Sequence, residues 1–310
     1  MTEKIRTAVI GVGYLGLFHA EKFAQLPESD LVGVVDTSRP RADEVAAKVG
    51  TTAYTDYREL LDKVDAVSVV VPTQYHFEVA RAFLERGIHV LLEKPITTTV
   101  EEADELIRLA EEKRAVFQVG HLERFNPVIV GLKGLLTGPR FIESIRIAPF
   151  KPRGTDVNVV LDLMIHDIDI IQTVVGSPVK QISSIGAPVF TDEEDIANAR
   201  IQFENGCVAN VTASRISLKS ERKMRIFQAD SYISVDFQNK KLAVFRKGSG
   251  EMFPGIPKVD MEETSFEQGD ALKAEIASFL NCVLTGAKPV VSGQDGKRAL
   301  ETALKISNKL

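Results

Sequence analysis

The sequence has few cysteines, no long apolar run and no excess of positive charge. Its two cysteines, Cys207 and Cys282, cannot form a disulfide framework or a four-cysteine zinc site. No apolar stretch approaches the roughly 20 residues that cross a bilayer. Lysine and arginine number 38 against 43 acidic residues, and the net charge of −5 gives the whole chain no attraction for nucleic acid or anionic lipid. We therefore expect neither a nucleic-acid partner nor a membrane partner.

The length and composition are those of a globular protein. The chain has 310 residues, of which 44% are hydrophobic and 26% charged, and at roughly 150 residues per domain this suggests two domains. A strand-like run begins within a few residues of Met1, which leaves no room for a signal peptide. Together with the low cysteine content, this predicts a cytoplasmic protein.

The first part of the chain alternates short β-branched runs with longer segments of helical period. This pattern is typical of a parallel sheet covered on both faces. Strands are expected at residues 7–10, 31–35, 66–71, 89–92 and 116–119. Helices are expected between them at residues 15–26, 39–49, 77–86 and 100–113. Residues 1–120 are therefore predicted to form a doubly wound α/β domain of the Rossmann type.

The pattern changes after His121. Residues 126–136 and 159–175 are predicted to be helical, residues 182–245 alternate as strands broken by turns, and helices are expected again at 270–284 and 294–309. Residues 121–310 are therefore predicted to form an α+β domain with a large, mostly antiparallel sheet.

A glycine-rich turn follows the first expected strand. Gly11, Gly13 and Gly16 stand at G-x-G-x-x-G spacing, immediately before a helix. In this motif the first glycine makes a tight turn, the second lets the backbone approach a pyrophosphate, and the third lets the helix pack on the strand. The helix N-terminus favours the phosphates. The combination predicts a dinucleotide site.

An acidic residue, Asp36, ends the second expected strand. An acid about 20 residues after the glycines binds the ribose hydroxyls and repels the 2′-phosphate of NADP. At an effective dielectric constant of about 20, a charge pair about 4 Å apart is worth about 4 kcal/mol before screening. NAD is therefore expected rather than NADP, although Arg39 and Arg41 lie close enough in sequence to weaken this preference.

Two further motifs end the strands expected at 66–71 and 89–92. They are Pro72-Thr73 with His76, and Glu93-Lys94-Pro95, at the sheet edge where open α/β folds bind ligands. A lysine has three donors and can stabilise negative charge that develops on a substrate oxygen. The alternative is a solvated lysine in a surface loop. The sequence leaves open whether the Lys94–Pro95 bond is cis.

A polar stripe marks the helix expected at 159–175. At about 100° per residue, Asp162, His166 and Asp169 share one narrow face. An imidazole near carboxylates is suited to proton transfer at neutral pH. Three interpretations stay open: a structural hydrogen-bonded stripe, a metal site or an acid–base group. No metal is expected, because the chain has no H-E-x-x-H motif and this helix has no second histidine.

In combination, these motifs resemble the glucose-fructose oxidoreductase and inositol dehydrogenase family (Gfo/Idh/MocA) over nearly the whole chain. The resemblance rests on residues 11–16 with His19, Pro72-Thr73 with His76, residues 87–95, and Asp162 with His166 and Asp169.

The resemblance implies NAD-dependent hydride transfer between a sugar or polyol hydroxyl carbon and nicotinamide. It implies that the catalytic groups are Lys94, Asp162 and His166, with His166 taking the hydroxyl proton, Lys94 holding the same oxygen and Asp162 orienting them. It also implies that residues 121–310 bind the substrate and form a homodimer or homotetramer through the C-terminal sheet.

The residues expected to bind the cofactor are Gly11, Gly13, Tyr14, Leu15, Gly16, Asp36, Pro72, Thr73, His76, Glu93 and Lys94. The residues expected to contact the substrate are His121, Arg124, Asn126 and Asp169, with interdomain hydrogen bonding as the alternative for the first three.

A basic run at residues 215–225 bears on the substrate. It holds five basic residues and one acid. It is interpreted either as a solvated strand edge or as a segment that binds a pyrophosphate. With residues 124–127 it resembles relatives that oxidise nucleotide sugars, including UDP-N-acetylhexosamine 3-dehydrogenases. The alternatives are a dehydrogenase of a free sugar or inositol, and, from another class, a non-catalytic NAD(H)-binding sensor or scaffold.

Overall fold

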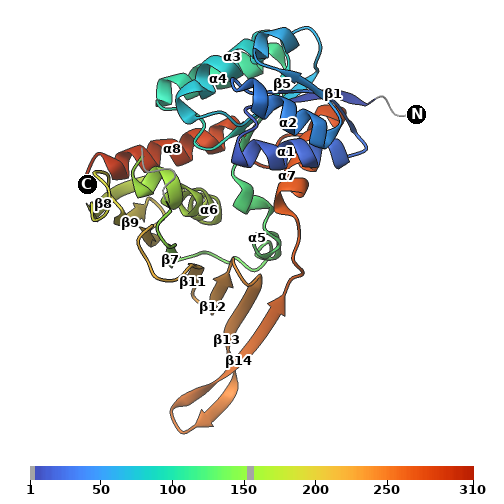
Figure 1. The fold of residues 1–310 in the computed structure, drawn as a ribbon. Helices are drawn as coiled ribbons and strands as arrows, with labels where there is room; N and C mark the ends of the chain where they lie inside the picture. Colours follow the sequence, from blue (N-terminus) through green and yellow to red (C-terminus); the bar gives the residue numbers. More distant parts are fainter. Residues whose placement is uncertain (1–3, 152–156) are drawn as a thin grey trace. The chain divides into compact units, whose positions relative to one another are not determined.

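The computed structural model describes residues 4–151 and 157–310 (Figure 1). The chain divides into two compact units. The first comprises Met1–Leu122 and Asp270–Leu300, and the second comprises Glu123–Gly269 and Glu301–Leu310. Among the described residues, no helix is both long and apolar enough to span a membrane.

The first unit alternates strands and helices. Its strands are β1 (Ile5–Ile10), β2 (Ser29–Val35), β3 (Thr52–Tyr54), β4 (Ala66–Val69), β5 (His89–Glu93) and β6 (Phe117–Gly120). Its α-helices are α1 (Tyr14–Gln25), α2 (Arg39–Val49), α3 (His76–Leu84), α4 (Val100–Lys113), α7 (Ala271–Thr285) and the first part of α8 (Gly293–Ser307). Short 3-10 turns in this unit are η1 (Tyr57–Leu60) and η2 (Thr73–Tyr75), and a third, η3 (Leu122–Phe125), spans the boundary with the second unit.

The six strands found in the described part of this unit form one parallel sheet in the order β3-β2-β1-β4-β5-β6. Helices α1, α2 and α7 pack on one face around Phe23, Val45 and Phe279, and α3 and α4 lie together on the other (Figure 1). Each such fully buried side chain contributes about 1.5–3 kcal/mol. The predicted Rossmann fold is confirmed, and the order of strands reverses between β1 and β4, where ligands of such sheets bind.

Local sequence explains several helix boundaries in this unit. Thr99 and Glu102 form a capping box at the start of α4. Gly50 ends α2 with a φ of +75°, a conformation that costs glycine little.

The second unit is built on a sheet. Its strands are β7 (Phe141–Ile147), β8 (Val179–Ala187), β9 (Ile196–Phe203), β10 (Val208–Ser214), β11 (Glu221–Phe227), β12 (Ser231–Asp236), β13 (Lys241–Phe253) and β14 (Ile256–Ser265). Its helices are α5 (Pro127–Gly131), the π-helical segment η4 (Val160–Met164), α6 (Ile165–Val175) and the end of α8.

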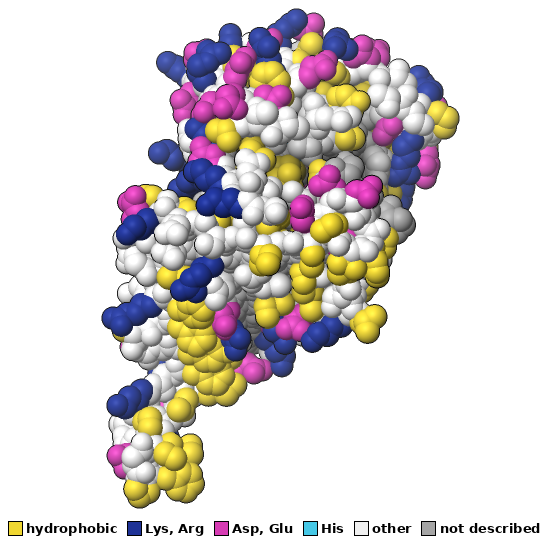
Figure 2. Space-filling view, turned by 90° about the vertical axis from the view of Figure 1, so that its left-hand side faces the viewer, with side chains coloured by type: hydrophobic (Ala, Val, Ile, Leu, Met, Phe, Trp, Pro, Cys, Tyr) yellow, Lys and Arg dark blue, Asp and Glu magenta, His cyan; other side chains and the backbone are white. Residues whose placement is uncertain are grey.

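The sheet order in the described residues of this unit is β14-β13-β12-β11-β7-β10-β9-β8, and all pairs except β7 with β10 are antiparallel. The predicted mostly antiparallel sheet is thus confirmed. Helix α6 packs on the face to which Ile142, Ser144 and Arg146 of β7 point. The other face carries a row of aromatic rings, and Figure 2 shows hydrophobic side chains gathered in a band above the β13–β14 hairpin and at its tip.

Several elements differ from their predicted bounds. The helix expected at 126–136 is the five-residue α5, which Pro127 begins. The helix expected at 159–175 starts with a π-helical turn, in which each residue rotates less than in an α-helix. Strand pairing continues past residue 245 into the β13–β14 hairpin, whose far part is exposed and alternates little.

Candidate active site

The glycine turn has the geometry that its sequence predicts. Gly11 has a φ of +85°, and a Cβ there would lie 2.7 Å from the carbonyl oxygen of Val70. A Cβ at Gly16 would lie 1.9 Å from the carbonyl oxygen of Gly11, because α1 packs directly on the turn. A Cβ at Gly13 would meet no heavy atom within 4 Å. The turn therefore leaves open space at the glycine that is expected to face a pyrophosphate.

Asp36 lies beside this turn, just after β2. Its carboxylate accepts hydrogen bonds from the backbone N–H of Val12 at 3.2 Å and of Ser38 at 2.9 Å. The two nearby arginines are engaged elsewhere: Arg41 donates to the carbonyl oxygens of the turn, and Arg39 pairs with Asp43. The position thus presents an anchored negative charge, which favours two ribose hydroxyls over a 2′-phosphate.

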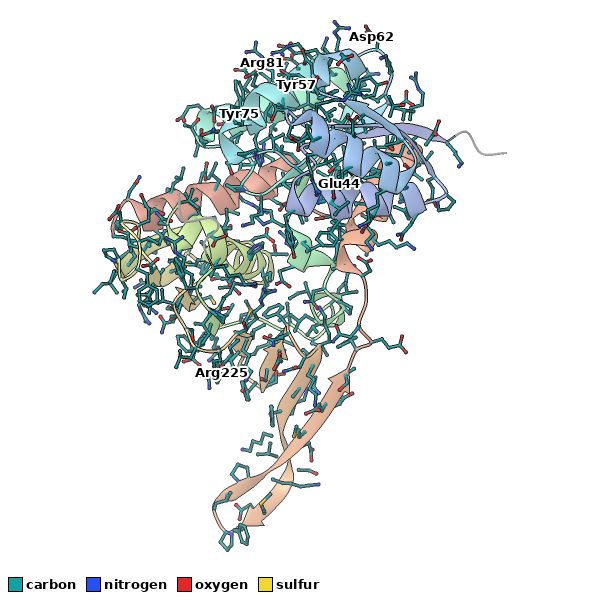
Figure 3. All side chains as sticks on the ribbon, viewed as in Figure 1. Glu44, Tyr57, Asp62, Tyr75, Arg81 and Arg225 are labelled. Atoms are coloured by element: carbon teal, nitrogen blue, oxygen red, sulfur yellow. The ribbon has the colours of Figure 1, made fainter. Side chains whose placement is uncertain are left out.

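A cavity of about 990 Å³ opens along the carboxyl ends of these strands. The predicted cofactor residues that line it are Gly11, Gly13, Leu15, Asp36, Pro72, Thr73, His76, Glu93 and Lys94. Tyr57 and Tyr75 also border it (Figure 3). Tyr14 and Gly16 are not among its lining residues. Gly16 is covered by the turn, and the side chain of Tyr14 is 71% exposed. The cavity is large enough for a dinucleotide-sized ligand.

Residues 55–58, which follow β3, also line this cavity and were missed by sequence reasoning. The reason is that β3 has only three residues and no distinctive pattern. The sequence feature that could have revealed these residues is Thr55-Asp56, two turn residues that precede the short 3-10 helix beginning at Tyr57.

His76 connects two of the motifs. Its Nδ1 lies 2.8 Å from the carbonyl oxygen of Pro95, and its Nε2 lies 2.9 Å from that of Val71. Burial lowers the pKa of His76, and the contacts with the two carbonyl oxygens act in the opposite direction. The Lys94–Pro95 peptide bond is cis. His76 therefore fixes the two loops of the cavity to each other.

Glu93 is held between α1 and the start of the Lys94 loop. His19, which is fully buried, places Nε2 3.1 Å from Glu93 Oε1 and Nδ1 2.9 Å from the hydroxyl of Ser68. The backbone N–H of Lys94 donates to Glu93 Oε2 at 3.2 Å. Burial acts to raise the pKa of Glu93, but the hydrogen bond and charge of His19 and the charge of Lys94 lower it overall. Glu93 is therefore a carboxylate at neutral pH.

A second carboxyl group is buried near Glu93. Glu275 of α7 is fully buried, and Gln118 donates to its backbone oxygen at 3.3 Å. Neither side-chain oxygen of Glu275 has a hydrogen-bond partner within the described residues. Burial, and then the negative charge of Glu93, raise the pKa of Glu275 well above its usual range. This group favours the protonated form.

In the second unit, the motif helix carries Asp162 in the π-helical turn and His166 in the first turn of α6. The predicted stripe assumed an α-helix throughout, and the π-helical turn changes the rotation per residue between these two positions. Both side chains are partly buried. A π-turn is often found at functional sites, which is consistent with the role expected for this segment.

Asp169 and Arg124 bind each other. Arg124 donates from Nε to Asp169 Oδ2 at 2.6 Å and from Nη2 to Oδ1 at 2.8 Å, and Asp169 is buried whereas Arg124 is partly buried. Asn126 accepts from the N–H of Val128 as the N-cap of α5 and donates to Glu123. Three of the expected substrate residues are therefore in contact with other side chains of the second unit. His121, at the end of β6, is buried in the first unit.

Sequence reasoning missed a buried ionic cluster beside His166. Arg146 of β7 donates from Nε to Asp167 Oδ2 at 2.6 Å and from Nη1 to Glu123 Oε1 at 2.9 Å. Ser144 donates to Asp167 at 2.9 Å. Burial acts against ionisation, but the two carboxylates raise the pKa of Arg146, and Arg146 lowers that of Glu123. The cluster fixes the start of α6 on the sheet. The polar residues at inward-facing positions of β7 are the sequence feature that could have predicted it.

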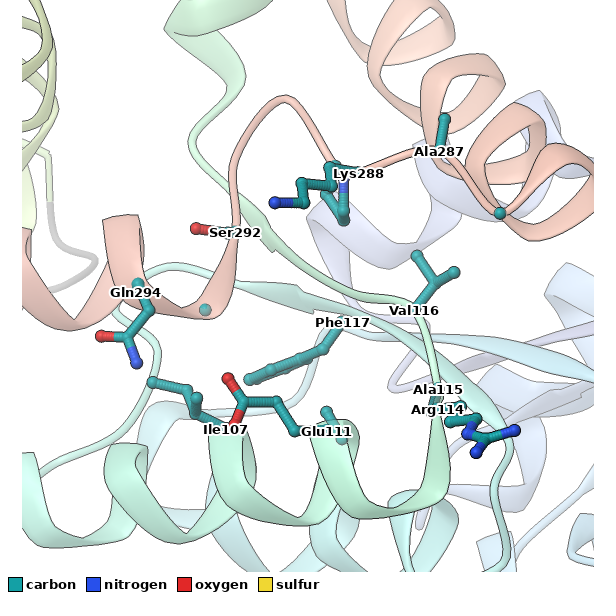
Figure 4. A pocket seen from close by; sticks show the side chains of 14 residues that line it. Ile107, Glu111, Arg114, Ala115, Val116, Phe117, Ala287, Lys288, Ser292 and Gln294 are labelled. Carbon is teal, nitrogen blue, oxygen red and sulfur yellow. The ribbon is translucent and has the colours of Figure 1, made fainter.

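A smaller cavity of about 370 Å³ lies in the first unit between α4 and the segment that joins α7 to α8 (Figure 4). Ile107, Phe117 and Lys288 are among the residues that line it. It contains none of the motif residues, and we assign it no role.

Comparison with known proteins agrees with these features. Residues 5–121 match the family model of the oxidoreductase family with an NAD-binding Rossmann fold, and residues 148–233 match the GFO/IDH/MocA C-terminal domain. The first of these matches confirms the predicted cofactor, NAD.

Two curated relatives match almost the whole chain. The chain is 44% identical to UDP-N-acetylglucosamine 3-dehydrogenase of Acidithiobacillus ferrooxidans, over 97% of this chain and 96% of the relative. It is 27% identical to scyllo-inositol 2-dehydrogenase (NAD(+)) of Bacillus subtilis, over 99% and 94%. A solved structure of the Acidithiobacillus enzyme superposes with a TM-score of 0.94 at 43% identity, over 100% of this chain and 98% of that one. The chain therefore belongs to the Gfo/Idh/MocA family of NAD-dependent oxidoreductases.

Proposed function

We propose that this protein is an NAD-dependent 3-dehydrogenase of a UDP-N-acetylhexosamine. The observation that carries the proposal is the 44% identity to UDP-N-acetylglucosamine 3-dehydrogenase over nearly the full length of both chains. The retention of every chemical group that the family motifs require, Lys94, Asp162 and His166, supports turnover rather than cofactor sensing.

The residues of the first unit fit the cofactor. Gly13 leaves room for a pyrophosphate, Asp36 suits the adenosine ribose, and Glu93 and Lys94 line the far end of the same cavity. Bound NAD supplies the acceptor for the hydride, which is the chemistry that amino-acid side chains lack.

The protein's own groups handle the proton and the oxygen. We assign His166 as the base that takes the proton of the sugar hydroxyl, since an imidazole titrates near neutral pH. We assign Lys94 as the group that donates to the same oxygen and stabilises the negative charge that develops there. Asp162 orients these groups. Contacts with the substrate by His121, Arg124, Asn126 and Asp169 belong to the same proposal.

The experiment is a substrate panel with the purified protein. NADH formation is measured with UDP-N-acetylglucosamine, N-acetylglucosamine, glucose, myo-inositol and scyllo-inositol. We expect reduction of NAD with the UDP-sugar and not with the free sugars or inositols. Turnover of an inositol alone would favour the alternative, for which the 27% identity to scyllo-inositol 2-dehydrogenase is the supporting observation. Tight NADH binding without turnover of any of them would favour the sensor.

We also propose that the protein is a homodimer or homotetramer that pairs through the open face of its large sheet. Phe141, Phe227, Tyr232 and Phe245 form a row on this face with ring centroids 5.8, 5.0 and 5.0 Å apart. Such contiguous apolar surface marks an interaction site. Light scattering should give a multiple of the chain mass, and Phe245→Asp should lower it. A wild-type protein with the mass of one chain would contradict this part of the proposal.

Two further assignments complete the proposal. Residues 1–120 bind the cofactor and residues 121–310 supply substrate binding and pairing, although α7 from the later segment packs in the first compact unit. A cytoplasmic location is supported by the two buried free thiols, Cys207 and Cys282, since reduced cysteines persist in that compartment. Cell fractionation tests it.

A further inference from the structure

The basic run at residues 215–225 is divided by the fold into side chains with different surroundings. Arg215 is buried and has a structural role. It donates from Nε to Asp195 at 2.8 Å, from Nη1 to the carbonyl oxygen of Val157 at 2.7 Å and from Nη2 to the hydroxyl of Thr191 at 2.9 Å. These contacts fix the 191–195 loop to the end of β10, so Arg215 does not face a ligand.

Three other basic residues of the run are paired with acids. Lys219 lies 2.7 Å from Glu221, and Lys223 lies 3.8 Å from the same carboxylate. Arg225 contacts Glu143 at 2.5 Å across the strand pair. Lys223 and Arg225 alternate with the buried residues of β11, so they point to the open face of the sheet, and Figure 3 shows Arg225 on the side away from α6. These side chains are solvated, as the first interpretation expects, but the strand-edge part of that interpretation is wrong, because β11 lies between β12 and β7.

Arg222 is on the other face of β11. The strand register places it directly opposite Arg146 of β7, and it alternates in phase with the buried Met224. Arg146 binds Asp167 of α6 on that face. Arg222 therefore belongs to the face of the sheet that carries α6, whose first turn holds His166.

The surroundings of Arg222 leave its donors available. Its side chain is 51% exposed, and its one ion pair in the described part of the chain is to Glu123 Oε1, at 3.6 Å. Glu123 already accepts from Arg146 at 2.9 Å and from Asn126 at 3.0 Å, so it does not need Arg222. The guanidinium donates no hydrogen bond to any residue that the structure describes, although it carries five N–H groups.

Arg222 lies beside the buried guanidinium of Arg146. Burial, and then the positive charge of Arg146, lower the pKa of Arg222, whereas the carboxylates of Glu123 and Asp167 raise it. An anion bound to the guanidinium would favour its charged form.

We propose that Arg222 binds the diphosphate group of the substrate and is the residue that selects a nucleoside-diphosphate sugar over a free sugar. This inference rests on the proposed function. A planar guanidinium with free N–H groups binds phosphate oxygens in a bidentate manner, and a free sugar or inositol offers no such partner. Of the basic run, Arg222 is the residue that combines an inward position with available donors.

The test compares Arg222→Gln, Arg222→Lys and the control Arg225→Gln, which removes the same charge from the open face of the same strand. We expect Arg222→Gln to raise the KM for UDP-N-acetylglucosamine by about 10-fold or more, with kcat within about threefold and the KM for NAD unchanged. Arg222→Lys should recover part of the loss. Arg225→Gln should behave as wild type, with its mass in solution checked by light scattering.

A second measurement isolates the phosphate contact. Calorimetric binding of UDP should weaken by the same factor in Arg222→Gln, while binding of uridine, which lacks the phosphates, should be unaffected. NADH binding and the melting temperature report whether each variant is folded; if Arg222→Gln is not folded, the comparison uses Arg222→Lys.

The outcomes separate the two claims. If the wild type oxidises UDP-N-acetylglucosamine and Arg222→Gln retains its KM, the role of Arg222 is wrong and the proposed function stands. If the wild type oxidises no UDP-sugar, the proposed function is wrong. Calorimetry then decides on Arg222: weaker UDP binding in Arg222→Gln supports the contact, and equal binding or none to the wild type overturns it.

Discussion

The preference for NAD can be tested at Asp36. Its carboxylate is anchored by two backbone N–H groups at the end of the cavity that is proposed to bind the adenosine, so its charge has a defined position. Asp36→Asn removes the charge and preserves the size of the side chain. At an effective dielectric constant of about 20, the repulsion of a phosphate charge about 4 Å away is about 4 kcal/mol. Since the cavity is open to solvent, screening reduces this to about 1–2 kcal/mol.

The expected result is a change in relative affinity. Fluorescence titration with NADH and NADPH should show that the ratio of Kd for NADPH to Kd for NADH falls by about 5- to 30-fold in Asp36→Asn. Both titrations are independent of the sugar substrate. Asp62→Asn removes a charge from the same unit, pairs with Arg86 outside the cavity and serves as the control. A ratio that is the same in wild type and Asp36→Asn would refute the electrostatic explanation of cofactor choice.

The remaining predictions concern catalysis, packing and pH. Lys94→Ala and His166→Asn should each lower kcat with UDP-N-acetylglucosamine by about 100-fold or more while NADH still binds, and an unchanged kcat would remove that residue from the mechanism. Gly16→Ala should lower the melting temperature, because its Cβ would lie 1.9 Å from a carbonyl oxygen, whereas Gly13→Ala should keep the melting temperature and weaken NADH binding. The pKa of Glu275 is raised by burial and a neighbouring carboxylate, so folding should lose stability as the pH rises above the ordinary pKa of a glutamate. Glu275→Gln should therefore melt above wild type at pH 8 and by a smaller margin at pH 5 in scanning fluorimetry; an equal margin at both would show that Glu275 is not protonated in the fold.

The Rossmann half was predictable because its signals are local. The glycine turn, Asp36 and the strand-end motifs each lie within a few residues, and parallel strands bring their carboxyl ends to one edge. The cavity accordingly contains nine of the eleven residues expected to bind the cofactor. Its third strand was missed because three residues carry too little periodicity.

The second unit was less predictable because its decisive contacts are between distant residues. Arg124 and Asp169 lie 45 residues apart in the sequence, so the sequence did not show that they bind each other. Helical periodicity assumes an α-helix, so it could not show the π-turn that carries Asp162. The division of the basic run between the two faces of the sheet follows from strand register, which is fixed by pairing with β7.

The most direct test of the proposed oxidation is transfer of deuterium from C3 of the sugar. UDP-N-acetylglucosamine carrying deuterium at C3 is incubated with NAD and the purified protein, and the nicotinamide product and the sugar are analysed by mass spectrometry. The account predicts deuterated NADH and a sugar nucleotide that has lost its deuterium. Unlabelled NADH, or a sugar that retains deuterium at C3 while NAD is reduced, would contradict it.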